Sequence, residues 1–232
     1  MLDKLKEDLL KCANPEKAKI LSKFFKTGKG QYGEGDVFLG VTVPEQQRIA
    51  TKYPEISLKD LRHLLRDKTH EHRLVALLLL IIRYRKANET GKGKIFDFYL
   101  KNTKNINNWD LVDLSAERIL GDYLLKRDRS ILYRFAKSDN LWVRRIAIMS
   151  TFAFIKNNQF KDTLNISKIL LNDKHDLIHK AVGWMLREIG KRNQQIEEQF
   201  LKNSYQQMPR TMLRYAIEKF DEKKRKSYLK KN

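Results

Sequence analysis

An aromatic ring and a carboxylate stand four residues apart in the stretch 107–113, whose sequence is Asn-Asn-Trp-Asp-Leu-Val-Asp. The asparagines can cap a helix that begins here, and Asp110 carries the charge that a helix N-terminus favours. Trp109 and Asp113 then project from one face, one turn apart. Such a pair suits chemistry on a nucleotide, because the ring packs against sugar or base while the carboxylate stabilises a developing cation or orients a water. The spacing alone fits an ordinary buried tryptophan equally well.

A second stretch, residues 140–147, combines a tryptophan with two adjacent arginines in the sequence Asn-Leu-Trp-Val-Arg-Arg-Ile-Ala. Its spacing predicts a helix with Trp142 toward the core, and with Arg144 and Arg145 reaching out of it. Arginine in such a place can fork onto a phosphate, or it can pair with a carboxylate of the neighbouring helix.

A third stretch, residues 180–188, reads Lys-Ala-Val-Gly-Trp-Met-Leu-Arg-Glu. Gly183 would let another helix or a ligand approach the backbone closely, because it has no side chain. Trp184 is either a core residue or a platform for a ligand. Lys180 and Arg187 add positive charge on the same predicted helix.

The one long irregular segment, Thr27–Gly40, holds five of the ten glycines. Its G-x-G-x-x-G match follows a predicted helix instead of a strand, which excludes a dinucleotide site. Loops of this length are usually functional or mobile. We expect a flexible loop or hairpin from which Lys29 and Tyr32 reach a phosphate backbone; the alternative is a plain glycine-rich connector.

Composition indicates the partner class. Lys and Arg total 48 against 28 Asp and Glu, a formal net charge of +20, so a polyanion is expected, nucleic acid first and an anionic membrane second. Cys12 is the single cysteine, which excludes an internal disulfide and a cysteine-based zinc site. The apolar run 74–82 is too short to span a bilayer, and the charged N-terminus has no signal-peptide core. We expect a cytoplasmic protein.

Metal chemistry has little support in the sequence. His175-Asp-Leu-Ile-His179 resembles the zincin pattern H-E-x-x-H, but its acid is one methylene shorter and no third ligand is evident. No metal or other cofactor is expected.

The elements that must position these residues are helices, because helical spacing dominates and strand alternation is almost absent. Helices are predicted to begin near residues 2, 15, 43 and 57, and to cover about 69–86, 93–101, 109–126, 130–136, 140–156, 162–171, 174–191, 194–202 and 209–220. Antiparallel pairs of about 40 residues favour an all-α, HEAT-like α-solenoid over a compact bundle. We expect a single domain over 1–232, with a Gly-rich loop or hairpin at about 27–40.

Taken together, the stretches 108–113, 139–145 and 180–188, in this order and spacing, resemble the bacterial DNA alkylation-repair glycosylases of the AlkD type. Residues 14–18 and 38–45 fit the same family, so the resemblance covers nearly the whole chain. It implies a HEAT-like solenoid whose basic concave face binds duplex DNA. It also implies hydrolysis of the glycosidic bond of cationic N3- and N7-alkylpurines, without drawing the base into a pocket.

The resemblance also assigns roles. Asp113 matches the family's catalytic carboxylate, Trp109 and Trp184 match the aromatic cleft residues at the lesion deoxyribose, and Arg145 matches the phosphate-contacting arginine.

The segment 27–36 looks longer than in the best-understood members of this family, which leaves a second function open: a non-catalytic binder of distorted or branched DNA that uses the same concave face. A HEAT scaffold for protein partners is a third possibility, poorly suited to this charge. We expect a monomer.

Overall fold

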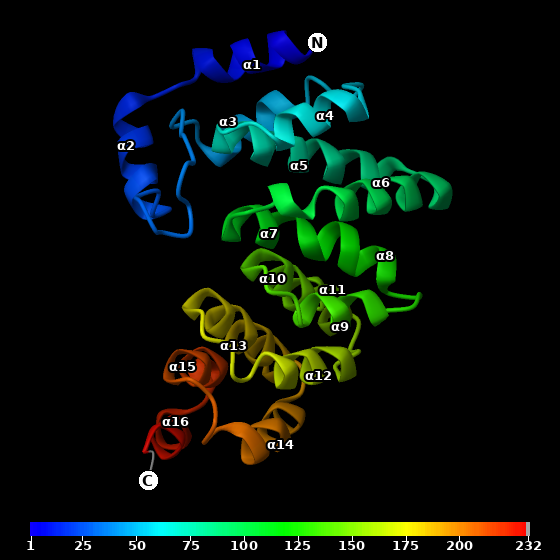
Figure 1. Ribbon diagram of the computed structural model, residues 1–232. Helices are drawn as coiled ribbons and strands as arrows, with labels where there is room; N and C mark the ends of the chain where they lie inside the picture. The colour runs from blue at the N-terminus through cyan, green and yellow to red at the C-terminus, as the bar shows by residue number, and fades with distance from the viewer. Residues whose placement is uncertain (231–232) are drawn as a thin grey trace. The chain divides into compact units, whose positions relative to one another are not determined.

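The computed structural model describes residues 1–230, and its regular structure is helical (Figure 1). No β-strand forms within this range; the extended pairing seen there is an isolated bridge between Val37 and Thr69. The chain divides into two compact units, residues 1–115 and the residues from 116 onward. None of the described helices is long and apolar enough to cross a membrane.

The first unit contains the helices α1 (Leu2–Lys11), α2 (Pro15–Phe24), α3 (Val43–Ala50), α4 (Leu58–Leu65), α5 (His70–Lys86) and α6 (Glu89–Lys101), the 3₁₀ turn η1 (Thr103–Asn105) and nearly all of α7 (Trp109–Ala116). The second contains the π-helical segment η2 (Glu117–Gly121), the helices α8 (Asp122–Leu124), α9 (Ser130–Ala136), α10 (Leu141–Ser150), α11 (Phe152–Lys156), α12 (Lys161–Ile169), α13 (Asp176–Gly190), α14 (Gln194–Ser204) and α15 (Arg210–Ala216), the 3₁₀ turn η3 (Ile217–Lys219) and α16 (Glu222–Leu229).

Helix α5 is the centre of the first unit. Its residues from His70 to Ile81 are all buried, so the helix has no solvent face over three turns. Helices α3 and α4, which precede α5 in the chain, and α6, which follows it, pack against it. Polar side chains at its N-terminus are buried too, and these must find partners inside the protein.

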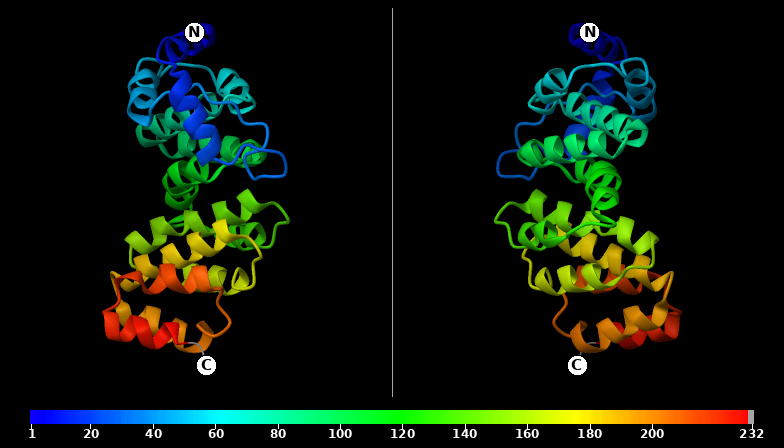
Figure 2. Two further views of the ribbon diagram at one scale, coloured as in Figure 1. Left: turned by 90° about the vertical axis from the view of Figure 1, so that its left-hand side faces the viewer. Right: turned by 90° about the vertical axis from the view of Figure 1, so that its right-hand side faces the viewer.

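Helix α13 has the same role in the second unit. It packs against α10 and α15, while α12 and α14 flank it in sequence and in space. Both views of Figure 2 show the yellow-green, yellow and orange helices α10, α13 and α15 running alongside one another. A Cβ atom at Gly183 would lie 2.4 Å from the Met212 carbonyl oxygen, which confirms that this glycine permits a close helix contact. Successive helix pairs thus form an all-α helical repeat, as predicted.

Several boundaries differ from the predicted ones; α6, for example, begins at Glu89 and not near residue 93. The helix expected over 109–126 is interrupted by the π-helical segment η2, and the helix expected over 140–156 breaks between α10 and α11 at Thr151. The residues after the last predicted helix form the separate helix α16 with Asp221 as its cap. A π-helical insertion and a one-residue break leave hydrophobic spacing nearly unchanged, so periodicity does not reveal them.

Candidate functional site

Helix α7 begins where its sequence predicts. The Trp109 backbone N–H donates to the Asn108 side-chain oxygen (2.8 Å), and the Val112 N–H donates to the Asn108 carbonyl oxygen (3.1 Å). Asn108 is fully buried, so these bonds form away from water. Trp109 and Asp113 follow on one helix, and each is half-buried, which leaves part of both side chains at the surface.

Aromatic side chains from the end of α2 hold the Trp109 indole. Its ring stacks on Phe25, with centroids 5.2 Å apart and planes 20° from parallel, and meets Phe24 edge to face at 5.9 Å. These are favourable aromatic geometries. A mainly apolar pocket of about 450 Å³ opens beside the indole, between α2 and the start of α5.

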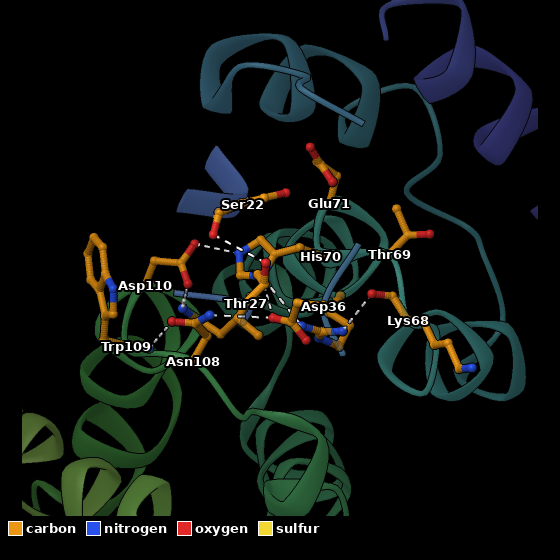
Figure 3. A network of polar contacts seen from close by, with 12 residues as sticks. Ser22, Thr27, Asp36, Lys68, Thr69, His70, Glu71, Asn108, Trp109 and Asp110 are labelled. Carbon is orange, nitrogen blue, oxygen red and sulfur yellow. Dashed lines mark hydrogen bonds and ion pairs between the residues drawn. The ribbon is translucent and has the colours of Figure 1, made fainter. Parts of the chain in front are cut away.

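A network of polar side chains adjoins Trp109 at the start of α7 (Figure 3). His70 Nε2 is 2.7 Å from Asp110 Oδ2, and His70 Nδ1 is 3.3 Å from Asp36 Oδ2. Arg73 Nη2 approaches the same Asp36 oxygen at 2.6 Å. The sequence indicates Asp110 as a charge at a helix start, but not its contact with His70, because contacts between positions more than 30 apart leave no local pattern.

Glu71 fastens the far end of the glycine-rich segment. Its carboxylate is almost fully buried and accepts hydrogen bonds from the backbone N–H groups of Leu39 (3.0 Å), Gly40 (2.8 Å) and Val41 (3.3 Å). Gly40 has φ +81°, and a Cβ there would lie 2.1 Å from the Asn14 carbonyl oxygen, so no other residue fits. One buried carboxylate thus accepts hydrogen bonds from three backbone N–H groups that are not paired in a β-sheet.

The glycine-rich segment is a loop, the first of the two expected alternatives, and it is anchored at several points. Val37 pairs with Thr69 through a single bridge, and the Gly33 N–H donates to the Lys26 carbonyl oxygen (3.2 Å). Tyr32 is half-buried, with its hydroxyl 3.4 Å from the Phe24 carbonyl oxygen, so it lies on α2 instead of extending outward. Lys29 is exposed at the tip of this loop, as expected.

In the second unit, Trp184 stands on α13 and is half-buried. Its indole N–H donates to Glu188 Oε1 (3.2 Å), and Phe152 lies 6.1 Å from its ring. Trp184 and Glu188 therefore repeat the tryptophan–acid spacing of α7. The carboxylate of Glu188 is buried and is also bound by three cations, Lys191 at 2.6 Å, Arg192 at 3.7 Å and Arg187 at 3.9 Å.

The two adjacent arginines of α10 lie differently from the prediction. Arg145 is only 4% exposed and donates to the Leu177 carbonyl oxygen, so it does not reach out of the core. Arg144 forms an ion pair with a carboxylate, as in the alternative that the sequence left open, but its partner Asp173 (2.6 Å) lies in the turn before α13 and not on a helix. Both side chains run toward the start of α13, because a buried guanidinium must satisfy its donors with protein acceptors.

The basic residues of α13 are engaged as well. Arg187 pairs with Glu218 and lies near Glu188, while Lys180 pairs with Asp176 at 2.7 Å on its own helix. Each of these two cations is partly exposed.

The histidines of the zincin-like pattern have other contacts. His175 is the N-cap of α13, its Nδ1 accepting the Leu177 N–H (3.1 Å), and His179 Nε2 contacts the Asp173 carbonyl oxygen. Among residues 1–230 no three His, Cys, Asp or Glu side chains gather closely enough to hold a metal ion.

Comparison with known proteins identifies the family. A family model described as DNA alkylation repair enzyme matches residues 5–220. The chain belongs to this family. The resemblance inferred from the three tryptophan-containing stretches is thereby confirmed, and so is DNA repair as the broad function.

Solved structures of DNA alkylation repair proteins share the fold. A predicted DNA alkylation repair enzyme from Enterococcus faecalis is 19% identical, with a TM-score of 0.70 over 90% of this chain and 97% of that one. AlkD2 from Streptococcus mutans is 19% identical, with a TM-score of 0.55 over 89% of this chain and 98% of that one. No curated protein matches the chain by sequence search.

Proposed function

We propose that this member of the DNA alkylation repair family is a DNA N-glycosylase that removes cationic N3- and N7-alkylated purines from duplex DNA. The observation that carries the proposal is the pair on α7: a tryptophan whose ring is fixed by Phe25, with Asp113 one turn further on and partly at the surface. Trp184 is the second aromatic residue proposed for the lesion deoxyribose.

The chemistry follows from the charge of the lesion. An N-alkylated purine already carries a positive charge, so it leaves as a neutral base when the bond from C1′ to the ring nitrogen breaks and the bonding electrons go with the base. The sugar becomes an oxocarbenium-like cation, which the Asp113 carboxylate opposes and the tryptophan faces accommodate. A water adds to C1′ and releases a proton, leaving an abasic site. No general acid is needed to expel the base.

Duplex DNA is the proposed partner, bound by a monomer in the cytoplasm without a cofactor. A net charge of +20 supports a polyanion, and antiparallel helix pairs can present a basic concave face. The basic and loop residues proposed to contact the backbone are Lys29, Tyr32, Arg144, Arg145, Lys180 and Arg187. Of these, Lys29 lies on the exposed tip of the loop, while Arg144 and Arg187 already have carboxylate partners that would reduce their attraction for a phosphate.

A second function, binding of distorted or branched DNA without excision, is favoured by one observation. The glycine-rich loop is anchored through Asp36, which contacts Asn108 at the start of α7, and the same loop carries the exposed Lys29. A loop fixed in this way can add a groove contact that needs no chemistry.

The deciding experiment incubates the purified protein with methylated duplex DNA and measures free 7-methylguanine and 3-methyladenine. Release well above spontaneous depurination supports the glycosylase. Tight, salt-dependent binding with release no faster than the spontaneous rate would contradict excision and support the binder, with a log–log salt slope of about −0.9 per neutralised phosphate.

A further inference from the structure

Four charged side chains form a buried cluster in the first unit, and the proposed reaction uses none of them directly. They are Asp36 from the loop, His70 and Arg73 from α5, and Asp110 from α7, with side-chain exposures of 5%, 3%, 4% and 18%. Figure 3 shows the imidazole of His70 lying between the two carboxylates.

The charges of the cluster balance only when His70 is a cation. Burial alone would lower the pKa of His70, but hydrogen bonds to Asp110 and Asp36 and the charge of Asp110 raise it above its ordinary value, against Arg73. Burial alone would raise the pKa of Asp36, but hydrogen bonds from His70 and Arg73 and the Arg73 charge lower it. Two carboxylates then face two cations; a neutral imidazole would leave one buried negative charge without a partner.

The cluster is joined to Trp109 by hydrogen bonds. Asp110, the partner of His70 Nε2, directly follows Trp109, and its other oxygen accepts the Leu111 N–H at 2.8 Å. Asn108, which receives the Trp109 N–H, has its side-chain nitrogen 3.4 Å from Asp36 Oδ2. Asp110 is therefore held by His70 of α5, and Asn108 by Asp36 of the loop.

The same imidazole belongs to the aromatic stack that carries the indole. Its ring lies 4.7 Å from Phe38 and 5.0 Å from Phe25, and Phe25 stacks on Trp109 at 5.2 Å. His70 is thus the one side chain of the cluster that touches both the ionic and the aromatic supports of Trp109 in the described part of the first unit.

We propose that His70 is a positioning residue for the excision reaction: by bridging Asp36 of the glycine-rich loop and Asp110 of α7, it fixes the Trp109 ring and makes the loop and the catalytic helix one mechanical unit. This inference rests on the proposed function. Side chains that orient a reacting group act through geometry, and a displacement of about 1 Å can cost about 100-fold in rate.

The test replaces His70 with glutamine, which can hydrogen-bond to one carboxylate but carries no charge. The matched control is His63→Gln on α4, whose side chain is exposed. We expect the single-turnover rate constant for 7-methylguanine release to fall about 10- to 100-fold in His70→Gln. Its Kd for the same oligonucleotide should change less than about threefold, because the Trp109 ring is shifted and not removed, and His63→Gln should match the wild type.

Two further readouts separate positioning from mere folding. The groups that face His70 are Asp36, Arg73 and Asp110. The wild-type rate constant should fall as pH rises through the pKa of His70 in the folded protein, while His70→Gln should show no step in that range. The double variant His70→Gln, Asp110→Asn lets two amides pair, so it should regain part of the rate without regaining the pH step.

An activity-independent measurement keeps this inference apart from the glycosylase proposal. Protein labelled with 5-fluorotryptophan has three ¹⁹F resonances, one for each tryptophan, assigned with single Trp→Phe variants. His70→Gln should displace the Trp109 resonance and leave those of Trp142 and Trp184 in place. An unmoved Trp109 resonance, or a rate constant equal to that of His63→Gln, would overturn the role of His70. A wild-type protein that releases no base would overturn only the glycosylase.

Discussion

Helices α7 and α13 each carry a tryptophan followed four residues later by an acid, but the surroundings of the two acids differ. Glu188 on α13 is buried, accepts the Trp184 indole N–H and lies among cations of its own helix and of the turn that follows. Asp113 on α7 is half-buried, and its tryptophan is supported by Phe25 and a network from other parts of the chain. The same sequence spacing therefore encodes a structural carboxylate in one unit and a candidate catalytic one in the other.

The largest predicted effect that tests this comparison is on the rate constant of base excision. Asp113→Asn keeps the side-chain size but removes the charge that opposes the cationic sugar, so excision of 7-methylguanine should fall by about 100- to 1,000-fold. Glu188→Gln should change the rate constant of the folded protein by only a few-fold, since Glu188 is buried and is not the carboxylate proposed to oppose the cationic sugar. Single-turnover release on one oligonucleotide measures both.

Asp113→Asn should retain DNA affinity, and Glu188→Gln should lower the unfolding temperature because cations around it lose their partner. If both substitutions reduced the rate constant equally, the distinction between the two carboxylates would be wrong.

An intermediate effect concerns the contribution of the two tryptophan rings to DNA binding. In the Asp113→Asn background, which should bind without turnover, Trp109→Ala and Trp184→Ala should each weaken binding to alkylated duplex by about 1–3 kcal/mol, the usual loss for one stacking platform. Fluorescence anisotropy measures this loss. Trp109→Ala should lower the unfolding temperature more than Trp184→Ala, because it also removes the stack on Phe25 and the edge contact with Phe24. Equal unfolding temperatures would contradict the difference in support.

The smallest predicted effect is on the pH dependence of stability, and it distinguishes two buried carboxylic acids. Asp36 in the first unit has donors around it, whereas burial first, and then the charge of Glu198, raise the pKa of Glu197 in the second unit to about 8. The folded state thus retains a proton on Glu197 that the unfolded state loses near pH 4.5, so this group destabilises the fold increasingly as pH rises toward 8.

Glu197→Gln should therefore raise the unfolding temperature at pH 9, by at least about 2–4 °C, the shift that 1 kcal/mol produces in a chain of this size. It should change little at pH 4. Asp36→Asn should do the opposite at neutral pH, because the lowered pKa of Asp36 stabilises the fold above the pKa of the unfolded chain and loses that effect as pH falls. Calorimetry at both pH values measures each variant; stabilisation of Glu197→Gln at pH 4 alone would contradict the assignment.

Local features of the fold could be predicted from the sequence because their causes are local. Asn14 caps α2 with Pro15 at its first position, and Ser57 caps α4 by accepting the Asp60 N–H at 3.0 Å, as their sequences indicate. The close approach at Gly183 is likewise indicated by the residue type alone. Each of these features depends on residue types within a few positions of one another.

The supports of the candidate site could not be predicted in the same way. His70, Glu71 and His72 follow one another and suggest no shared function by spacing, yet the first two bind residues 30 to 40 positions away. Arg145 was expected at the surface because arginine usually is, and its buried bond to the Leu177 carbonyl depends on where α13 begins. Such contacts depend on tertiary packing, which helical periodicity does not reveal.

The anchors of the glycine-rich loop also determine where this chain can change in length. Asp36 and Glu71 fix one side of the loop, and the bond from Gly33 to Lys26 fixes the other, while Gly30 and Gly35 have positive φ and no atom within 4 Å of a would-be Cβ. The free energy of closing a loop grows slowly, by about 0.6 kcal/mol for each doubling of its length. Insertions and deletions at this tip would therefore leave the ends of the loop where they are, and loops of many sizes could share one base.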